Sequence, residues 1–563
     1  MLRGMRTSAR AVVEVLVAVT VLSACRPGPA PAGAAAQSQA SQPSQAAPPP
    51  TAGTGANAEA AAIGAAGDGK TDDRGALQAV IDRAAAGTGD VSLPAGTFLI
   101  SSDKQYGLKI PGGVRLHGAG QDKTILLQAP GFYGGARTLF VTGPGITIAD
   151  LTLDGNKQAQ TPSGQRHGLM AVDTAGLRVE RVTAKNHTGD GFYLYTGANN
   201  STLVNVLATG NARNGITLGG MVDGTVLMSS KFIANKAQQV DSEPGRQAEV
   251  SNTWVIDNDI DGGGISTDYV LTCSGTETDT RGHGWTVIGN RINGGINVVW
   301  AENVVIAGNT GVNPTNKPSV VVYRSSVNVT IMGNHFTQSG ARVAGVAILG
   351  TKGGGPQRVM VAENTIETTN EQGFGVQAQG ARSVVIKDNV LRGSGRPARG
   401  YAGVALRATN PASDFESAVV TGNRISNFGA YGVQIMGNGT AKLLSVDIRN
   451  NTFDDNSAAP SMTEGISLDD GTGAAQQIAV VGNKYLGGVS SEVVNYPQAV
   501  PVLVEGVRGS GGVYSIAGSP EGAMAETVGA KVIRRDAGPG PKYYVKLSGK
   551  GTKTGWAPRE APP

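Results

Sequence analysis

The chain has 563 residues, of which 83 are glycine, 5% are aromatic and 16% are charged. Its formal net charge of +4 is too close to neutral to indicate a nucleic-acid-binding protein. A near-neutral chain has no field that steers a polyanion toward it, so an acidic substrate would have to be held by local residues.

The first 24 residues predict a secretory signal peptide. Basic residues (Arg3, Arg6 and Arg10) precede an apolar run from Val15 to Leu22, which is too short to span a bilayer. The sequence Leu22-Ser23-Ala24-Cys25 then resembles a bacterial lipobox. We expect cleavage before Cys25 and lipidation of its thiol, which predicts a cell-envelope protein, either an outer-membrane lipoprotein or one at the cell surface. The alternative is an ordinary signal peptide with an incidental cysteine.

Residues 25–60 consist mainly of Ala, Pro, Gln, Ser and Gly. This composition cannot bury a core and predicts a disordered tether. The folded part begins near residue 61, where Thr71-Asp72-Asp73 is a helix-start signal. Apolar residues follow at helical spacing, namely Ala76, Leu77, Val80, Ile81 and Ala84. An amphipathic helix at this point would cover the open end of a solenoid.

Asparagine recurs at intervals of 19 to 34 residues along the folded part. The positions are Asn156, Asn186, Asn211, Asn235, Asn258, Asn290, Asn309, Asn334, Asn364, Asn389, Asn423, Asn451 and Asn483. Most follow a short apolar alternation such as VVIAGN, and most precede a second short strand such as GITL. This pattern predicts an all-β fold, a right-handed parallel β-helix of about 12 to 14 coils over residues 61–500. We expect the asparagines to occupy left-handed turns and their side chains to stack in hydrogen-bonded rows.

The opening segment GDGKTDDRGALQAVIDRAA, with VSLPAGTFLIS after it, resembles the N-terminal region of the pectate-lyase-like superfamily of β-helix proteins. That superfamily includes polygalacturonase-type hydrolases, pectate lyases, mannuronan epimerases and phage tailspikes. The resemblance implies the fold and carbohydrate as a substrate class, but no particular reaction. The Asp-Pro-His-Glu run of the epimerases is missing from the comparable coil, Gly191–Tyr195. The polygalacturonase acidic pair has no counterpart in order either.

Residues 501–563 resemble a C-terminal element of phage tail fibres. The segment reads as a short β-meander whose bulky residues are Tyr543, Tyr544 and Trp556. We expect it to cap the C-terminal end of the solenoid. The alternative is a tip that binds carbohydrate or mediates oligomerisation.

The outward side chains of the second strand in each coil form the candidate site, because strand side chains alternate and coils are about 4.8 Å apart. Strand phase places acidic and aromatic residues on one patch. Asp241, Glu243 and Asp268 are the candidate catalytic acids, and Tyr193, Tyr195, Trp300, Tyr323 and Arg324 are the candidate substrate-binding residues. Hydrolysis of a glycosidic bond needs one protonated and one ionised carboxyl group, and crowded acids supply both. The alternative is that Asp241-Ser242-Glu243-Pro244 is only a turn.

These residues predict a surface-tethered enzyme that degrades a polysaccharide. Hydrolysis is favoured over β-elimination because the patch carries acids and one cation, Arg324. The alternative is a non-catalytic glycan-binding or matrix-structural lipoprotein. We expect contact with a membrane only through the lipid anchor and none with nucleic acid. No cofactor or metal is expected beyond a weak Ca²⁺ site at the three acids, and His167, His187 and His283 are expected to be loop residues without a catalytic role.

Overall fold

The structure is a computed structural model that describes residues 63–559 with gaps. The gaps are 246–247, 264–268, 276–281, 352–353, 370–372, 396–400, 409–414, 438–442, 459, 470–474 and several segments after residue 494. The predicted signal peptide, Cys25 and the predicted tether therefore lie outside the described residues, as does Asp268.

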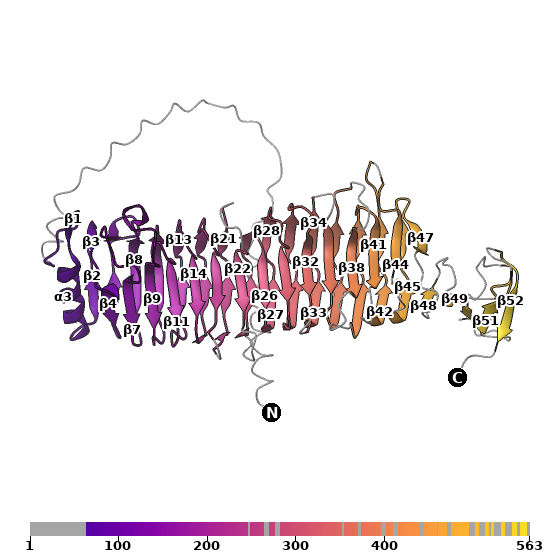
Figure 1. Cartoon of the computed structure of the whole chain (residues 1–563), viewed down its shortest axis with the longest axis horizontal. Helices are drawn as coiled ribbons and strands as arrows, with labels where there is room; N and C mark the ends of the chain where they lie inside the picture. Colours follow the sequence, from indigo (N-terminus) through magenta and orange to yellow (C-terminus); the bar gives the residue numbers. More distant parts are fainter. Residues whose placement is uncertain are drawn as a thin grey trace, which may run out of the picture. The chain divides into compact units, whose positions relative to one another are not determined.

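The described part is an all-β parallel solenoid of about 13 turns, as the asparagine repeat predicts (Figure 1). Successive coils contribute the strands of a 15-stranded parallel sheet. Its strands are β4 (Tyr106–Pro111), β7 (Arg137–Thr142), β9 (His167–Val172), β11 (Phe192–Tyr195), β14 (Ile216–Gly219), β18 (Val240–Glu243), β22 (Leu271–Ser274), β26 (Ile296–Val299), β29 (Val320–Tyr323), β32 (Ala344–Leu349), β35 (Phe374–Gln379), β38 (Ala402–Ala408), β41 (Tyr431–Gly437), β44 (Glu464–Asp469) and β47 (Ser490–Val494).

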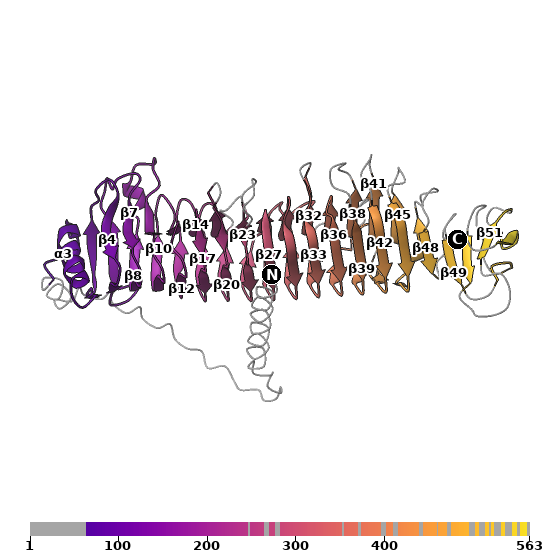
Figure 2. The ribbon, with the colours of Figure 1, turned by 90° about the horizontal axis from the view of Figure 1, so that it is seen from below.

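Most of the remaining strands form a 35-stranded sheet that runs along the same stack (Figure 2), and β15 (Val222–Asp223) and β19 (Val250–Ser251) form a separate two-stranded sheet. Two long strands, β8 (Thr147–Asp154) and β10 (Arg178–Lys185), pair along most of their length. Beyond β10 the sheet continues as two rows, which begin with β12 (Thr202–Val204) and β13 (Leu207–Thr209). From Asn258 onward the asparagine repeat lies in the turn between these two rows, whereas Asn211 and Asn235 lie in the turn that precedes the 15-stranded sheet.

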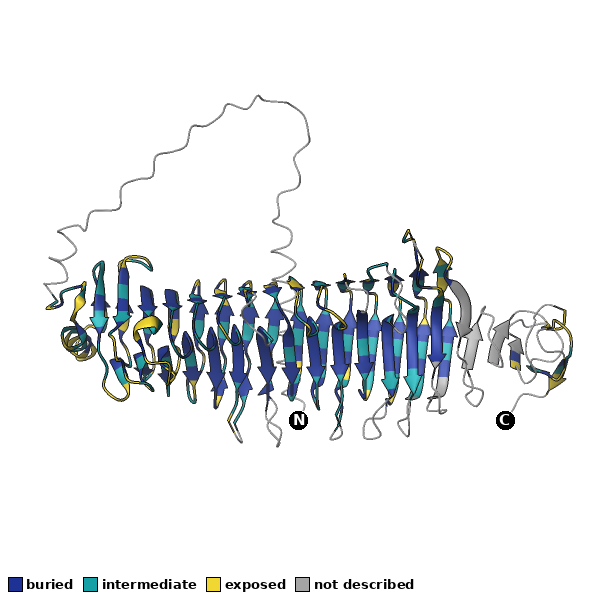
Figure 3. Ribbon diagram, turned by 45° about the horizontal axis from the view of Figure 1, so that its top comes forward, coloured by how far each residue is buried: buried dark blue, intermediate teal, exposed yellow. Residues whose placement is uncertain are grey.

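Alternation within the strands places the core between the sheets (Figure 3). In β14 the side chains of Ile216 and Leu218 are completely buried, and in β26 the same holds for Ile296 and Val298. These residues stack in register from strand to strand, so the inward phase expected from the sequence is confirmed. We call the opposite face of the 15-stranded sheet, which points away from this core, the outer face.

The asparagine side chains form a buried hydrogen-bonded ladder. In a typical rung, Asn334 Nδ2 donates to Asn364 Oδ1 and to the carbonyl oxygen of Ile306, each at 2.9 Å. The same pattern runs from Asn258 to Asn483. The expected stacking is thus confirmed. The expectation that the stacked asparagines themselves have a left-handed backbone is wrong. From Asn211 onward, positive φ belongs to the residue before each rung, for example Gly333 (61°) and Glu363 (56°).

A separate, shorter row lies in the turn before the 15-stranded sheet, where Asn211 Nδ2 donates to Asn235 Oδ1 and His187, not Asn186, is the residue next to Asn211. The backbone N–H of His187 donates to Asn211 Oδ1 at 3.0 Å, as later rungs do. The His187 Nε2 lies 3.2 Å from the carbonyl oxygen of Leu153 and therefore carries the proton. Asn156 and Asn186 instead have positive φ, as expected for all the asparagines.

The N-terminal helix α3 (Arg74–Ala85) buries Leu77, Ile81 and Ala84, as its spacing predicts. Asp73 does not cap this helix with its side chain, and its carboxylate instead accepts hydrogen bonds from the N–H groups of Ala66 and Gly67. At the other end, parallel pairing continues past residue 500 through β48 (Val502–Glu505), β49 (Val513–Ile516) and β50 (Lys531–Arg534).

The last three strands form an antiparallel meander of β50, β51 (Tyr543–Lys546) and β52 (Trp556–Arg559). Tyr544 and Trp556 are buried there. In the part of the chain that the structure describes, no helix is both long and apolar enough to cross a membrane.

Candidate active site

Two neighbouring rows of side chains on the outer face carry the candidate acids. Tyr193, Thr217 and Asp241 are register partners in β11, β14 and β18. Two residues further along the same strands, Tyr195 of β11 is the register partner of Gly219 in β14, and Gly219 is the register partner of Glu243 in β18. The structure therefore brings together four of the residues that strand phase selects, namely Tyr193, Tyr195, Asp241 and Glu243.

The two tyrosines lie over a stretch of backbone that only glycine leaves open. A Cβ atom on Gly219 would come within 2.7 Å of Tyr193 Cε2, and one on Gly220 within 3.1 Å of Tyr195 Cε2. The two rings meet edge to face, with their centroids 5.6 Å apart. This arrangement presents flat apolar ring surfaces beside the acids, which suits contact with sugar rings.

Asp241 is buried, with 5% of its surface exposed. The side-chain amide of Asn214 donates a hydrogen bond of 2.9 Å to its Oδ2. Burial and the neighbouring Glu243 carboxylate, with which it shares a hydrogen bond, raise the pKa of Asp241 to about 8. Asp241 is therefore a carboxyl group that keeps its proton near neutral pH, and we refer to Asp241 and Glu243 as the acid pair.

Glu243 is the open member of the acid pair, with a side chain that is 38% exposed. Its carboxylate is bound by one nitrogen of the Arg213 guanidinium. The other nitrogen of Arg213 donates to Asp190 Oδ2 at 2.8 Å, and the Asp190 side chain is completely buried. Arg213 therefore bridges the carboxylates of Asp190 and Glu243 through charge-assisted hydrogen bonds.

Two histidines expected in exposed loops are buried. His167 is 6% exposed, its ring centroid lies 5.1 Å from that of Tyr193, and its Nδ1 accepts a hydrogen bond of 3.1 Å from the Asp190 N–H. His187 is completely buried next to Asn211, and burial lowers its pKa to about 4. The expectation was wrong because His167 begins strand β9 and His187 belongs to a tightly packed turn between coils. His283 is partly exposed and pairs with Glu249.

The remaining predicted binding residues form a second group on the outer face. The Arg324 guanidinium carbon lies 4.2 Å from the centroid of Trp300 and 5.2 Å from that of Tyr323. Tyr323 belongs to β29, three strands beyond β18, which corresponds to about 14 Å. This second group, Trp300, Tyr323 and Arg324, therefore lies on the same face as the acid pair but further along the stack, and its strands are not neighbours of β18.

The coil that follows β18 differs from the expected one. Its strand in the 15-stranded sheet is β22, whose Leu271 pairs with Val240 of β18. Thr272 and Ser274 thus take the outward positions of this coil, one of which strand phase assigned to Asp268. The catalytic role of Asp268, which lies outside the described residues, stays a prediction.

Three residues of the site were missed by sequence reasoning, namely Asp190, Arg213 and Asn214. They precede strands β11 and β14 and sit in turns, where no alternation indicates the direction of a side chain. The available signal was the repeated polar-Gly step before each strand, Asp190-Gly191 and Asn214-Gly215. Asn214 also accepts a hydrogen bond from the Gln238 N–H at 3.0 Å, so it joins two coils below the acid pair.

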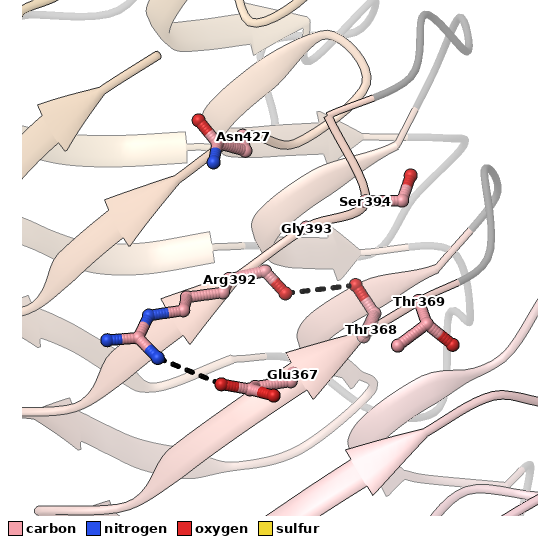
Figure 4. A pocket seen from close by; sticks show the side chains of 7 residues that line it. All are labelled: Glu367, Thr368, Thr369, Arg392, Gly393, Ser394 and Asn427. Carbon is pink, nitrogen blue, oxygen red and sulfur yellow. Dashed lines mark hydrogen bonds and ion pairs between the residues drawn. The ribbon is translucent and has the colours of Figure 1, made fainter. Parts of the chain in front are cut away.

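A pocket of about 340 Å³ lies elsewhere, on the side of the 35-stranded sheet (Figure 4). It is lined by Glu367, Thr368, Thr369, Arg392, Gly393, Ser394 and Asn427. Arg392 and Glu367 are paired there at 2.9 Å, so the two charges satisfy each other. Within the described ranges, no cluster of three or more His, Cys, Asp or Glu side chains could hold a metal ion.

Comparisons with known proteins match both halves of the solenoid. Residues 59–268 match the family described as rhamnogalacturonase A/epimerase, pectate lyase-like, and residues 279–490 match the right-handed β-helix region. Mannuronan C5-epimerase AlgE4 of Azotobacter vinelandii is 34% identical over 176 residues, which cover 28% of this chain and 32% of that protein. Alginate lyase 7 of the same organism is 31% identical over 168 residues, which cover 27% of this chain and 19% of that protein. The chain thus spans at most about a third of the length of these relatives.

Solved structures with a similar course of the chain include the A-module of mannuronan C-5 epimerase AlgE4 of Azotobacter vinelandii. It is 20% identical, with 76% of this chain and 95% of that chain covered and a TM-score of 0.30. The catalytic unit of a GH87 α-1,3-glucanase from Streptomyces thermodiastaticus is 15% identical, with 76% and 68% covered and a TM-score of 0.38.

Proposed function

We propose that this chain, a member of the pectate-lyase-like proteins with a right-handed β-helix fold, hydrolyses glycosidic bonds of a polysaccharide at the acid pair. The relatives named above act on polysaccharides, which supports carbohydrate as the substrate class. The observation that carries hydrolysis is the contrast between the two carboxyl groups. Asp241 is buried with a raised pKa, whereas Glu243 is open to solvent and paired with Arg213.

In the proposed reaction the acid pair holds one proton between its two carboxyl groups. The pair gives this proton to the glycosidic oxygen as the bond to the sugar carbon breaks. Its ionised carboxylate accepts a proton from the attacking water, so the pair ends the reaction with one proton again. Two adjacent carboxyl groups that share one proton can serve as both acid and base, as in aspartic proteases. Tyr193 and Tyr195 would support the sugar rings beside the cleaved bond.

The charges around the acid pair oppose a uronate at the cleaved position. With Asp241 protonated, Asp190 and Glu243 contribute two negative charges, and Arg213 contributes one positive charge. A substrate carboxylate at this point would add a second uncompensated negative charge. β-Elimination needs that carboxylate to be neutralised, so the site favours hydrolysis next to an uncharged sugar.

A second candidate is β-elimination or a related reaction at the carbon next to a uronate carboxylate. It is favoured by the names of the sequence relatives, which are mannuronan epimerases and an alginate lyase. In this reaction Tyr193, which packs against His167, would remove the proton. Burial, followed by the charge of Glu243, raises the pKa of Tyr193 to about 12, which makes it a poor base near neutral pH.

A panel of soluble neutral and uronate-containing polysaccharides tests the proposal. Hydrolysis predicts new reducing ends without the ultraviolet absorbance of an unsaturated uronide, and the Glu243→Gln variant provides the matched inactive control. Reducing ends accompanied by that absorbance would establish elimination in place of hydrolysis. Binding of a polysaccharide without either product would leave a non-catalytic glycan-binding protein.

We also propose that the enzyme is held at the bacterial cell envelope through lipidated Cys25. The lipobox-like Leu22-Ser23-Ala24-Cys25 supports this, because the cysteine of such a run carries the lipid and becomes the first residue of the mature chain. Fractionation of cells that express the wild type and the Cys25→Ser variant tests it. Membrane association and precursor processing that are unchanged by Cys25→Ser would contradict the lipid anchor.

A further inference from the structure

Two arginines on the outer face lack the hydrogen-bond partners that arginines in the interior of a protein normally have. Arg137 in β7 and Arg407 in β38 are both half-buried, and burial lowers the pKa of each. In both side chains the Nε atom is buried and has no hydrogen-bond partner. Among the described residues, neither guanidinium is paired with a carboxylate. Each lies over an aromatic ring, Arg137 at 5.5 Å from the centroid of Phe140 and Arg407 at 4.9 Å from that of Phe374.

Arg166 shows how the same protein satisfies a structural arginine. It is 3% exposed and also has no carboxylate partner in the described part of the chain, yet its guanidinium donates to the carbonyl oxygens of Phe132, Thr161 and Ser163 and to two threonine hydroxyl groups. Arg137, in contrast, donates to the carbonyl oxygen of Gln105 and to the thioether sulfur of Met170, which is a weak acceptor.

Arg407 has still poorer surroundings. It lies beside an apolar cluster on the outer face that contains Phe374, Ala402, Ala405 and Tyr401. A desolvated cation without an anion or a full set of acceptors costs free energy, so it is retained where a ligand supplies the missing group. Guanidinium groups over aromatic rings are suited to bind carboxylates and sulfates, because their donors form a planar fork.

The two arginines flank the acid pair along the stack. Register pairing places Arg407 in the outward row that contains Glu243 and Tyr323. Its strand, β38, is the sixth strand after β18, which carries Glu243. Arg137 lies four strands from the acid pair on the other side. At about 4.8 Å per coil, these separations are roughly 29 Å and roughly 19 Å. An extended glycan of about ten sugars could contact all three positions.

We propose that the outer face binds an acidic heteropolysaccharide, with carboxylate or sulfate substituents at Arg137 and Arg407 and an uncharged sugar at the acid pair. This inference rests on the proposed function in placing the glycan across Asp241 and Glu243. It explains why cations occur at the two distant positions, while Arg213, next to the acids, is already bound by Asp190 and Glu243. A polymer that carries charge on every sugar would place a carboxylate against the acid pair.

Binding is tested with two pairs of polymers that differ in charge on one backbone. The pairs are dextran with carboxymethyl-dextran and hydroxyethylcellulose with carboxymethylcellulose, both at low degrees of substitution. All proteins carry Glu243→Gln so that no polymer is cut, and affinity is measured by electrophoresis in polymer-containing gels. We expect at least one charged polymer to bind more tightly than its neutral partner. Arg407→Met and Arg137→Met should each weaken that binding about tenfold, with little change for the neutral polymer.

The control is Arg382→Met, because Arg382 is exposed and paired with Glu416. It should leave the binding of both polymers unchanged. The Tm of Arg407→Met should not fall, since the substitution removes a desolvated cation without a partner. The proposal would be overturned if charged and neutral polymers bind equally, if none of the four polymers binds, or if the arginine variants lose affinity equally for both members of a pair. Because the binding variants are already inactive, a failure of hydrolysis would not affect this result.

Discussion

The side-chain amide of Asn214 donates a hydrogen bond of 2.9 Å to Oδ2 of Asp241, one coil further along the stack. Asn214 is itself held by the Gln238 N–H on its Oδ1 and by Asp190, whose Oδ1 accepts from the Asn214 N–H at 2.9 Å. Asp241 is therefore fixed in a buried position by a residue that carries no charge. Its proton is retained because burial and the Glu243 carboxylate, which raise the pKa of Asp241, outweigh the opposing effect of the Arg213 charge.

This proton predicts a pH dependence of stability. The pKa of Asp241 is about 8 in the folded protein, against 3.8 for an ordinary aspartate. The folded state thus binds a proton that the unfolded chain releases, and this contribution is complete below about pH 4 and is lost as the pH rises toward about 8. We expect the Tm to decrease over this range by less in Asp241→Asn than in the wild type. Parallel Tm curves for the two proteins would contradict the buried protonated state.

Substitution of the acids should abolish cleavage without unfolding the protein. Asp241→Asn and Glu243→Gln each remove a proton-transfer group, so we expect about 10²- to 10⁴-fold lower rates of reducing-end release. Neither Tm should fall by more than a few degrees near neutral pH, because both replacements keep the side-chain size. Glu367→Gln in the distant pocket is the control and should retain full activity. Normal activity in both acid variants would exclude the acid pair, and a large loss of Tm would favour the turn interpretation of Asp241–Pro244.

The position of Tyr193 depends on the absence of a side chain at Gly219. In Gly219→Ala the added Cβ atom would lie 2.7 Å from Tyr193 Cε2, so the ring must move. We expect kcat/KM to fall about 10- to 100-fold, since misplacement of a binding group by about 1 Å has effects of this size. Gly75→Ala, where a Cβ meets nothing within 4 Å, is the matched control. Equal kinetics for the two alanine variants would show that Tyr193 does not support the substrate.

The asparagine ladder should carry a measurable part of the stability. Asn334→Ala removes the acceptor for the N–H and Nδ2 of Asn309 and the donor to Asn364, all of them buried. Leaving buried polar groups unpaired should lower the free energy of unfolding by about 2 kcal/mol or more. The exposed residue Asn456 provides the control, and Asn456→Ala should change the free energy of unfolding by less than about 0.5 kcal/mol. Denaturant unfolding measures both, and equal values would mean that the ladder does not stabilise the solenoid.

The sequence predicted the parts of this protein that follow a simple period. Alternation in β11, β14 and β18 was sufficient to place Tyr193, Asp241 and Glu243 on one face, because every coil repeats the same inward phase. The asparagine repeat predicted the stacking of the coils for the same reason.

Residues outside this period were not predictable. Arg213 and Asn214 act from a turn, where backbone geometry and not alternation sets the side-chain direction. Strand β22 begins at Leu271, later than strand phase predicts, so the outward positions of this coil are Thr272 and Ser274. The position with positive φ was not predictable from the repeat. The residue type that recurs is the ladder asparagine, whereas positive φ belongs to the residue before it, which is Gly, Asp, Glu, Ala or Asn.

The central claim is that the acid pair adds water across a glycosidic bond. Cleavage in water enriched in heavy oxygen, followed by mass spectrometry of the first oligosaccharides, tests this most directly. Hydrolysis predicts one heavy oxygen atom per new reducing end, and the Glu243→Gln variant should form no such ends. Unsaturated products that are lighter by one water and contain no heavy oxygen would contradict the account and establish elimination.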